Sequence, residues 1–171
     1  VVDTFNAYPH LWHRKLKERA PFAVVNVIVT AVGGESSDRG AERFERDVLS
    51  RNPDVVTIDY ALNDRRLGLQ KAREAWVKMI TAAKAKGVKV LLLTPTGDLK
   101  SKLADPNDPL NQHARQIREL AREYEVGLVD SWKCFVEYEG DLKDLMSQVN
   151  HPNRKGHDLV VKELMKWFPV K

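Results

Sequence analysis

Three short segments hold residue types that suit acyl-ester chemistry: Gly33-Gly34-Glu35-Ser36, Ala61-Leu62-Asn63-Asp64 and Asn150-His151-Pro152-Asn153. His151 suits the role of general base. Gly34 suits an oxyanion donor, because a glycine lets its backbone N–H approach a substrate closely. The side-chain amide of Asn63 suits the same role, since its nitrogen carries two hydrogens. Together these residues predict acyl transfer or hydrolysis through an acyl-enzyme.

The nucleophile that this chemistry needs is not marked by a motif. None of the chain's six serines follows Gly-Asp or lies in a Gly-x-Ser-x-Gly sequence. They are Ser36, Ser37, Ser50, Ser101, Ser131 and Ser147. The single cysteine, Cys134, has Trp132 and Phe135 close by in the sequence, which indicates a packed thiol rather than a nucleophile.

Four nearly continuous apolar runs predict the strands of a parallel sheet covered on both faces. They occupy residues 23–29, 54–60, 88–94 and 126–130. Apolar positions at helical spacing separate these runs, and an initial helix is expected at 8–19. The alternation predicts a three-layer α/β/α fold in a single domain over residues 1–171.

Two further helices are predicted from particular residues. A cap at Ser37 or Asp38 is expected to begin the helix that follows the first strand. Another helix is expected to begin near Asn153, with an apolar face that extends to Phe168. His157 lies in the first turns of that helix, and we interpret it as a structural residue.

The predicted strands place two of the candidate segments at one edge of the sheet. In open parallel sheets, ligands bind beyond the carboxyl ends of the strands. Residues 30–37 follow the first predicted strand and contain Gly34, and residues 61–64 follow the second and contain Asn63. The chemistry and the expected fold therefore point to the same edge.

The same segments resemble sequence blocks of the SGNH (GDSL-type) hydrolases. Residues 26–44 are similar to the second block, 53–64 to the third, whose pattern is Gly-x-Asn-Asp, and 151–157 to the fifth. The resemblance implies a flavodoxin-like sheet of strand order 2-1-3-4-5. It also implies a serine esterase with His151 as base and oxyanion donors at the two positions named above.

The chain departs from the family pattern in three places. The Gly-Asp-Ser block and its central strand do not occur in the 171 residues, so we expect an N-terminally shortened form of a longer protein. Ala61 replaces a glycine of the third block. Gln148 stands three residues before His151, where the family has its triad aspartate. A glutamine can orient an imidazole, but it cannot offset the charge of an imidazolium. A dyad helped by a carbonyl, or a more distant acid such as Asp144, is the alternative.

The expected reaction is hydrolysis of a short acyl ester, with an acetyl group on a carbohydrate as one option, and it needs no cofactor. The substrate is expected to be a small-molecule or carbohydrate ester, with specificity set by loops such as 96–107. Three alternatives stay open. They are an acyl- or glycan-binding module that has lost its nucleophile, an O-acyltransferase that uses the same site, and a flavodoxin-like binding domain with accidental motif matches.

Composition argues against several other classes. The net charge is +4 and the pI is about 9.2, yet basic and acidic residues are interleaved along predicted helices, so nucleic-acid binding is not expected. No apolar run approaches the roughly 20 residues that span a membrane. His10 and His13 supply only two ligands, so no metal site is expected. Oligomeric state and compartment stay open, because a cytoplasmic and a secreted protein both fit.

Overall fold

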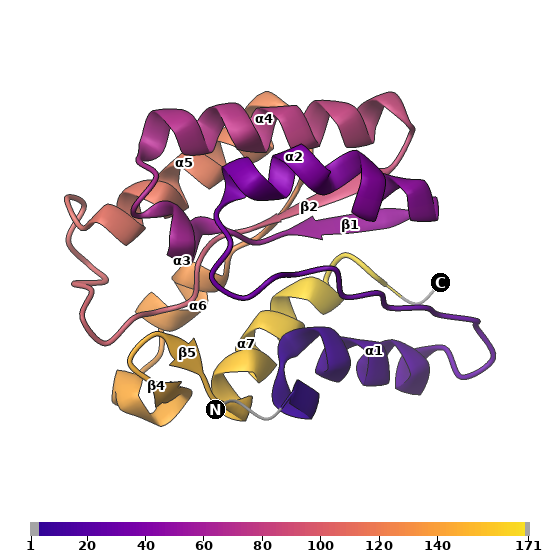
Figure 1. The fold of residues 1–171 in the computed structure, drawn as a ribbon. Coiled ribbons are helices and arrows are strands. Elements are labelled where there is room, and N and C mark those ends of the chain that lie inside the picture. Colours follow the sequence, from indigo (N-terminus) through magenta and orange to yellow (C-terminus); the bar gives the residue numbers. More distant parts are fainter. Residues whose placement is uncertain (1–3, 170–171) are drawn as a thin grey trace. The chain divides into compact units, whose positions relative to one another are not determined.

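A computed structural model describes residues 4–169 (Figure 1). The helices and strands, in chain order, are η1 (Thr4–Asn6), α1 (Tyr8–Arg19), α2 (Ser37–Asp47), η2 (Leu49–Arg51), β1 (Val55–Ile58), α3 (Ala61–Asp64), α4 (Leu69–Ala85), β2 (Lys89–Leu93), α5 (Pro109–Glu123), β3 (Gly127–Val129), α6 (Ser131–Val136), η3 (Leu142–Leu145), β4 (Met146–Gln148), β5 (His151–Pro152) and α7 (Arg154–Met165).

The described residues form two compact units. The sheet unit comprises residues 30–95 and 105–129, and the histidine unit comprises 4–29, 96–104 and 130–169. The single domain predicted over residues 1–171 stays a prediction.

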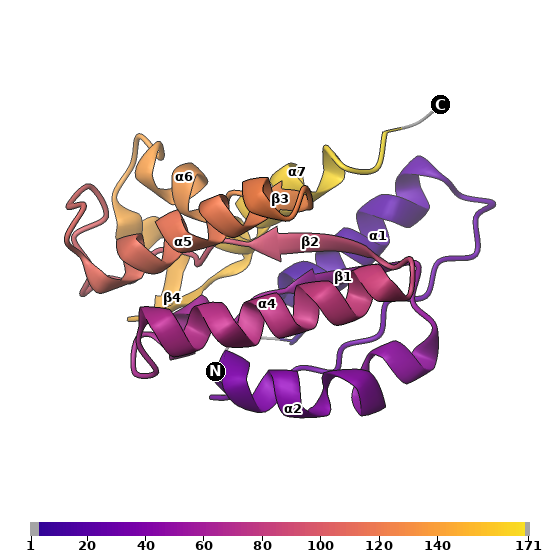
Figure 2. The same ribbon diagram turned by 90° about the horizontal axis from the view of Figure 1, so that it is seen from above.

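A parallel sheet of order β1-β2-β3 is the base of the sheet unit (Figure 2). Val56 of β1 pairs with Val90 of β2, and Leu92 of β2 pairs with Leu128 of β3. The three strands fall inside the predicted apolar runs, and the parallel sheet confirms the α/β fold class. Each strand is shorter than its run because the backbone ladder ends before the apolar residues do.

Helices α2, α4 and α5 supply the rest of the sheet unit's core. Trp76, Met79 and Ile80 of α4 are at most 1% exposed and lie in one cluster with residues of β1 and β2. Their spacing along α4 is the helical period that predicted a core face. Figure 1 shows α2 and α4 on the same side of the sheet, where they contact each other.

The strand predicted at residues 23–29 is wrong. Residues 24–32 have no regular secondary structure, and no strand among residues 4–169 pairs with them. Val24 is 91% exposed and Ile28 is 58% exposed. An apolar run forms a strand only where a neighbouring strand pairs with it, and no described strand pairs with this segment.

Helices α1 and α7 pack side by side in the histidine unit (Figures 1 and 2). Leu11 and Met165 lie in the apolar contact between them. Arg19, the last residue of α1, joins this helix to the end of α7. Its Nη1 donates to the carbonyl oxygens of Met165 (3.0 Å) and Phe168 (2.7 Å). The prediction for α1 is confirmed. Phe168, in contrast, lies beyond the end of α7, where its ring packs on Trp12.

The predicted cap of α2 needs a correction. Ser36, rather than Ser37 or Asp38, is the residue before the helix. Ser37 is already the first helical residue, and its backbone N–H donates to the carboxylate of Asp64 at 2.8 Å. A side chain from another segment thus satisfies a helix-end donor that the sequence assigned to a local cap.

Candidate functional site

Gly34 lies in a tight turn. The turn is closed by a hydrogen bond of 3.2 Å from the N–H of Glu35 to the carbonyl of Val32. The φ angle of Gly34 is +75°, which the third position of a type II turn requires and which glycine adopts without strain. A Cβ added here would meet no atom within 4 Å. The backbone of Gly34 is therefore open to a ligand.

Asn63 is tied to the same turn. It lies on α3, the single helical turn that follows β1, and its Nδ2 donates to the carbonyl oxygen of Glu35 at 2.9 Å. An amide nitrogen carries two hydrogens, so this bond uses one and leaves the other for a ligand. The two predicted oxyanion donors, Gly34 and Asn63, thus belong to one hydrogen-bonded group in the sheet unit.

The carboxylate of Asp64 joins α3 to helices α2 and α4. Asp64 is fully buried. Its Oδ1 accepts from the N–H of Ser37 and its Oδ2 from Nε1 of Trp76, both at 2.8 Å. Two N–H donors offset much of the cost of burying this carboxylate. Asn63 and Asp64 therefore hold Glu35 and Ser37 through two parallel links.

Glu35 is held by its side chain as well as by its backbone. Arg43 binds the carboxylate through two nitrogens, Nε at 2.8 Å from Oε1 and Nη2 at 2.5 Å from Oε2. The hydroxyl of Tyr60 donates to Oε2 at 3.3 Å. The bonds from Arg43 lower the pKa of Glu35, and burial raises the pKa of Tyr60 to about 12. At neutral pH the group is therefore a charged pair with a neutral phenol.

This support of the turn was not predicted from the sequence. Glu35 was only a member of a candidate segment, and Arg43 had no role. The available signal was an acidic residue just before α2 and a basic residue within it, eight positions later. That spacing is too common to identify a buried pair.

His151 lies on β5, which pairs with β4 in a short antiparallel hairpin (Figure 1). Gln148 is its partner across the hairpin. The side chain of His151 is exposed, and its Nδ1 is 2.8 Å from Oδ1 of Asn150, the preceding residue. Asn150 is therefore the residue that contacts the proposed base, a contact that its place in the candidate segment 150–153 did not predict. The orienting role of Gln148 stays a prediction.

The start of α7 holds this hairpin. Oδ1 of Asn153 accepts from the N–H of Gly156 at 3.2 Å, which confirms the predicted cap. Nδ2 of Asn153 donates to the carbonyl oxygen of Asp144 at 2.9 Å. A Cβ on Gly156 would lie 2.5 Å from the carbonyl oxygen of Leu145. Only a glycine therefore lets α7 approach the hairpin this closely.

Two other residues singled out in the sequence have buried surroundings. Burial lowers the pKa of His157 to about 4, so its ring is neutral at pH 7, and it packs near Tyr8. Burial raises the pKa of Cys134 to about 11, so its thiol is protonated at neutral pH and is a poor nucleophile. Within residues 4–169, no group of three or more His, Cys, Asp or Glu side chains is arranged to hold a metal ion.

The predicted site residues are therefore distributed between the units. Gly34 and Asn63 meet in the sheet unit through Glu35. His151 and Gln148 belong to the histidine unit.

Across the described part of the chain, no helix has the length and apolar character needed to span a bilayer.

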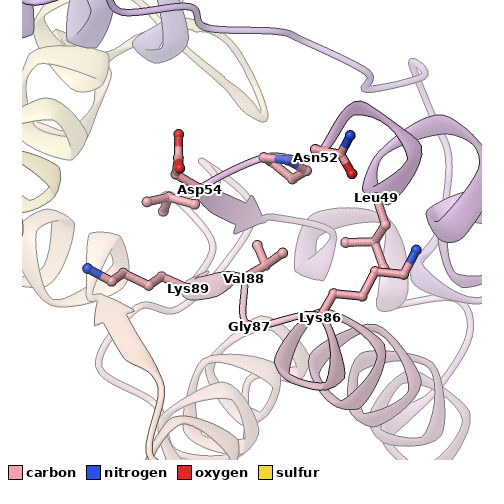
Figure 3. A pocket seen from close by; sticks show the side chains of 9 residues that line it. Leu49, Asn52, Asp54, Lys86, Gly87, Val88 and Lys89 are labelled. Carbon is pink, nitrogen blue, oxygen red and sulfur yellow. The ribbon is translucent and has the colours of Figure 1, made fainter.

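A cavity of about 400 Å³ lies elsewhere in the sheet unit (Figure 3). Its lining residues are Leu49, Asn52, Pro53, Asp54, Val55, Lys86, Gly87, Val88 and Lys89. These residues precede or begin β1 and β2, whereas the predicted donors follow the carboxyl end of β1. The cavity therefore belongs to the amino ends of the strands, and none of the predicted site residues lines it.

Residues 2–159 match the sequence profile of the GDSL-like Lipase/Acylhydrolase family. An uncharacterized lipoprotein of Bacillus subtilis (strain 168), YqeF, is 27% identical, over 74% of this chain and 61% of that protein. The chain thus spans about three fifths of the length of this relative.

Solved structures of two esterases are similar to the whole fold. The acetyl xylan esterase AlAXEase is 26% identical, with a TM-score of 0.82 over 96% of this chain and 91% of that chain. The acetylxylan esterase Axe2 from Geobacillus stearothermophilus is 19% identical, with a TM-score of 0.86 over 96% of this chain and 82% of that one. Solved catalytic mutants of Axe2 replace a serine, an aspartate and a histidine.

Proposed function

The chain belongs to the GDSL-like lipase/acylhydrolase family, a family of carboxylic-ester hydrolases, and we propose that its reaction is hydrolysis of a short acyl ester. An acetyl group on a carbohydrate is the proposed substrate. The names of the two similar solved structures, both esterases of acetylated xylan, support that choice. No cofactor is required, because a base and oxyanion donors supply the chemistry once a nucleophile is present.

Each proposed residue has one role. A serine hydroxyl attacks the ester carbonyl, and Nε2 of His151 takes the proton and returns it to the leaving alcohol, which leaves the acyl group on the serine. Nε2 of His151 then takes a proton from a water molecule that attacks this acyl-enzyme, and the proton passes to the serine oxygen as the acid is released. The N–H of Gly34 and the amide of Asn63 donate to the oxyanion that forms at the carbonyl oxygen. The serine is left unassigned, because none of the six serines in residues 1–171 lies in a nucleophile motif.

The observation that carries the proposal is the bond between Nδ2 of Asn63 and the carbonyl oxygen of Glu35. It ties the side-chain amide of Asn63 to the residue that follows Gly34, so one hydrogen bond restrains both proposed donors. Preorganised donors of this kind stabilise a developing negative charge without reorganisation during the reaction. A binding module that only recognises an acyl group does not need donors held in this way.

Acetate release from acetylated xylo-oligosaccharides tests the proposal in the natural protein that carries these residues. Loss of an oxyanion donor in Asn63→Ala should lower kcat by about 10²–10³ with KM nearly unchanged. Gln70→Ala, which also removes a side-chain amide, at an exposed position of α4, is the matched control and should leave both constants unchanged. A change in KM alone would assign Asn63 to substrate binding instead.

Two outcomes of the same assay identify the alternatives. With excess acceptor alcohol, an acyltransferase accumulates a new ester, whereas a hydrolase continues to release free acetate. A non-catalytic module binds the acetylated oligosaccharide in a calorimetric titration and releases no acetate from it. Either result would replace the hydrolase assignment.

A further inference from the structure

We infer that Asn150, the residue directly before His151, positions its ring by fixing which ring nitrogen carries the proton. In the family pattern an aspartate at the position of Gln148 has this task. The inference rests on the proposed role of His151 as general base. Its structural basis is the 2.8 Å contact between Nδ1 of His151 and Oδ1 of Asn150. Both residues lie in the histidine unit.

The contact selects one tautomer of the ring. A neutral imidazole has one N–H and one nitrogen lone pair. The amide oxygen of Asn150 can only accept, so the 2.8 Å contact is a hydrogen bond only in the tautomer that carries the hydrogen on Nδ1 of His151. Nε2 then keeps the lone pair that a general base needs. A neutral histidine side chain in water prefers the opposite tautomer, with the hydrogen on Nε2, so the contact has a definite effect to exert.

The hairpin restrains both residues of this pair. The hydroxyl of Ser147 donates to the carbonyl oxygen of His151 at 3.1 Å, and Pro152 restricts the backbone of His151 to extended conformations. On the other side, the N–H of Leu99 donates to the carbonyl oxygen of Val149 at 2.8 Å. The backbone on each side of Asn150 is therefore held, which keeps its side chain beside the ring.

The arrangement orients the ring without adding charge. The amide of Asn150 is neutral, so it cannot offset the positive charge that His151 gains when it takes a proton. His157 on α7 interacts electrostatically with His151, but burial lowers the pKa of His157 to about 4, so it too is neutral at pH 7. An aspartate at position 150 would keep the same tautomer and supply the missing charge.

The tautomer can be read directly from the ¹⁵N chemical shifts of the two ring nitrogens in protein labelled at histidine. At a pH where His151 is neutral, the unmodified protein should show the hydrogen on Nδ1. Asn150→Asp should keep it there, because a carboxylate oxygen also accepts. Asn150→Ala should move the hydrogen to Nε2, whereas the matched control Gln148→Ala should leave it on Nδ1.

Two results would overturn the inference. One is a hydrogen on Nε2 in the unmodified protein, which decides the question even if a variant does not fold. The other is a hydrogen that moves to Nε2 in Gln148→Ala but stays on Nδ1 in Asn150→Ala.

Turnover provides a second readout that a purely structural role would not move. Asn150→Ala should lower kcat at constant KM, and Asn150→Asp should restore it. The tautomer needs no turnover, so the two proposals fail separately. An Nδ1–H tautomer together with turnover that does not depend on His151 would contradict the proposed function alone.

Discussion

The donor side and the base side of the proposed site are built in different ways. In the sheet unit, Gly34 and Asn63 are supported by Glu35, which is part-buried, and by Asp64, which is buried, and both carboxylates bond to other segments. In the histidine unit, the ring of His151 is exposed, and its bonded partner is the adjacent residue.

This difference shows which side tolerates change. A buried, fully paired network is rigid, and losing one partner leaves a charge uncompensated. In the hairpin Met146 and Pro152 are buried, but residues 147–149 and His151 are exposed, and a short exposed turn can open locally at a small free-energy cost. We therefore expect substitutions around the donors to affect folding and activity together. Substitutions around His151 should affect activity first.

The largest effect is expected from His151→Ala. Removing the proposed base should lower kcat by several orders of magnitude while the fold stays intact, because the ring is exposed and carries little packing. Steady-state kinetics and circular dichroism measure the two quantities, with His13→Ala as the control. If His151→Ala lost its fold as well as its activity, folding would depend on the base side as it does on the donor side.

Arg43→Met should be the most destabilising change on the donor side. It leaves the Glu35 carboxylate, 9% exposed, without its charged partner, at a cost of about 3–5 kcal/mol in the free energy of unfolding. Arg46→Met is the matched control, since Arg46 is 77% exposed in its pair with Asp47 and its loss should leave the free energy of unfolding nearly unchanged. Urea denaturation measures the free energy of unfolding of both variants. Equal losses would contradict the special importance of the pair between Arg43 and Glu35.

A fall in pH should lower the free energy of unfolding, because His157 is buried. The pKa of this ring falls from 6.5 in the unfolded chain to about 4 in the folded one, so the unfolded chain binds more protons between these values. Stability should therefore decrease as the pH falls from about 6.5 to 4, by at most roughly 3 kcal/mol. His157→Phe should flatten this part of the stability curve, and an unchanged slope would contradict the assignment.

Gly156→Ala should destabilise the protein less than Arg43→Met does. A methyl group here meets the carbonyl oxygen of Leu145, so α7 or the hairpin must shift, at a cost of about 1–3 kcal/mol. Gly33→Ala is the control, because a Cβ at Gly33 meets no atom within 4 Å. A ¹⁵N–¹H spectrum should show the shift at His151, and a spectrum changed only near residue 156 would show that the helix moves alone.

The long helices and paired strands were predictable because their apolar residues repeat with a clear period. Trp76, Met79 and Ile80 on α4 illustrate this. Residues 23–29 carried an equally apolar pattern, but a strand also needs a partner, which the pattern cannot supply. The hairpin β4–β5 was missed because strands of three and two residues are too short to show alternation.

The candidate site residues were chosen by residue type, and their contacts could not be predicted. Gly34, Asn63 and His151 stood out because few side chains can perform their proposed roles. The partners that hold them did not, since the bonds from Asn63 to Glu35 and from Arg43 to Glu35 depend on how separate segments pack. Asn150 adjoins His151 in the sequence, yet only the turn of the hairpin brings its amide oxygen to the ring.

The bond from Leu99 to Val149 has a consequence for how such an enzyme can diversify. It joins the loop at 96–104 to the turn of the hairpin that carries His151. If residues 96–104 become longer or shorter to accept a different alcohol, this bond should transmit the displacement to the turn. New substrate preferences should therefore arise together with compensating substitutions in residues 146–152, as a linked set rather than one at a time.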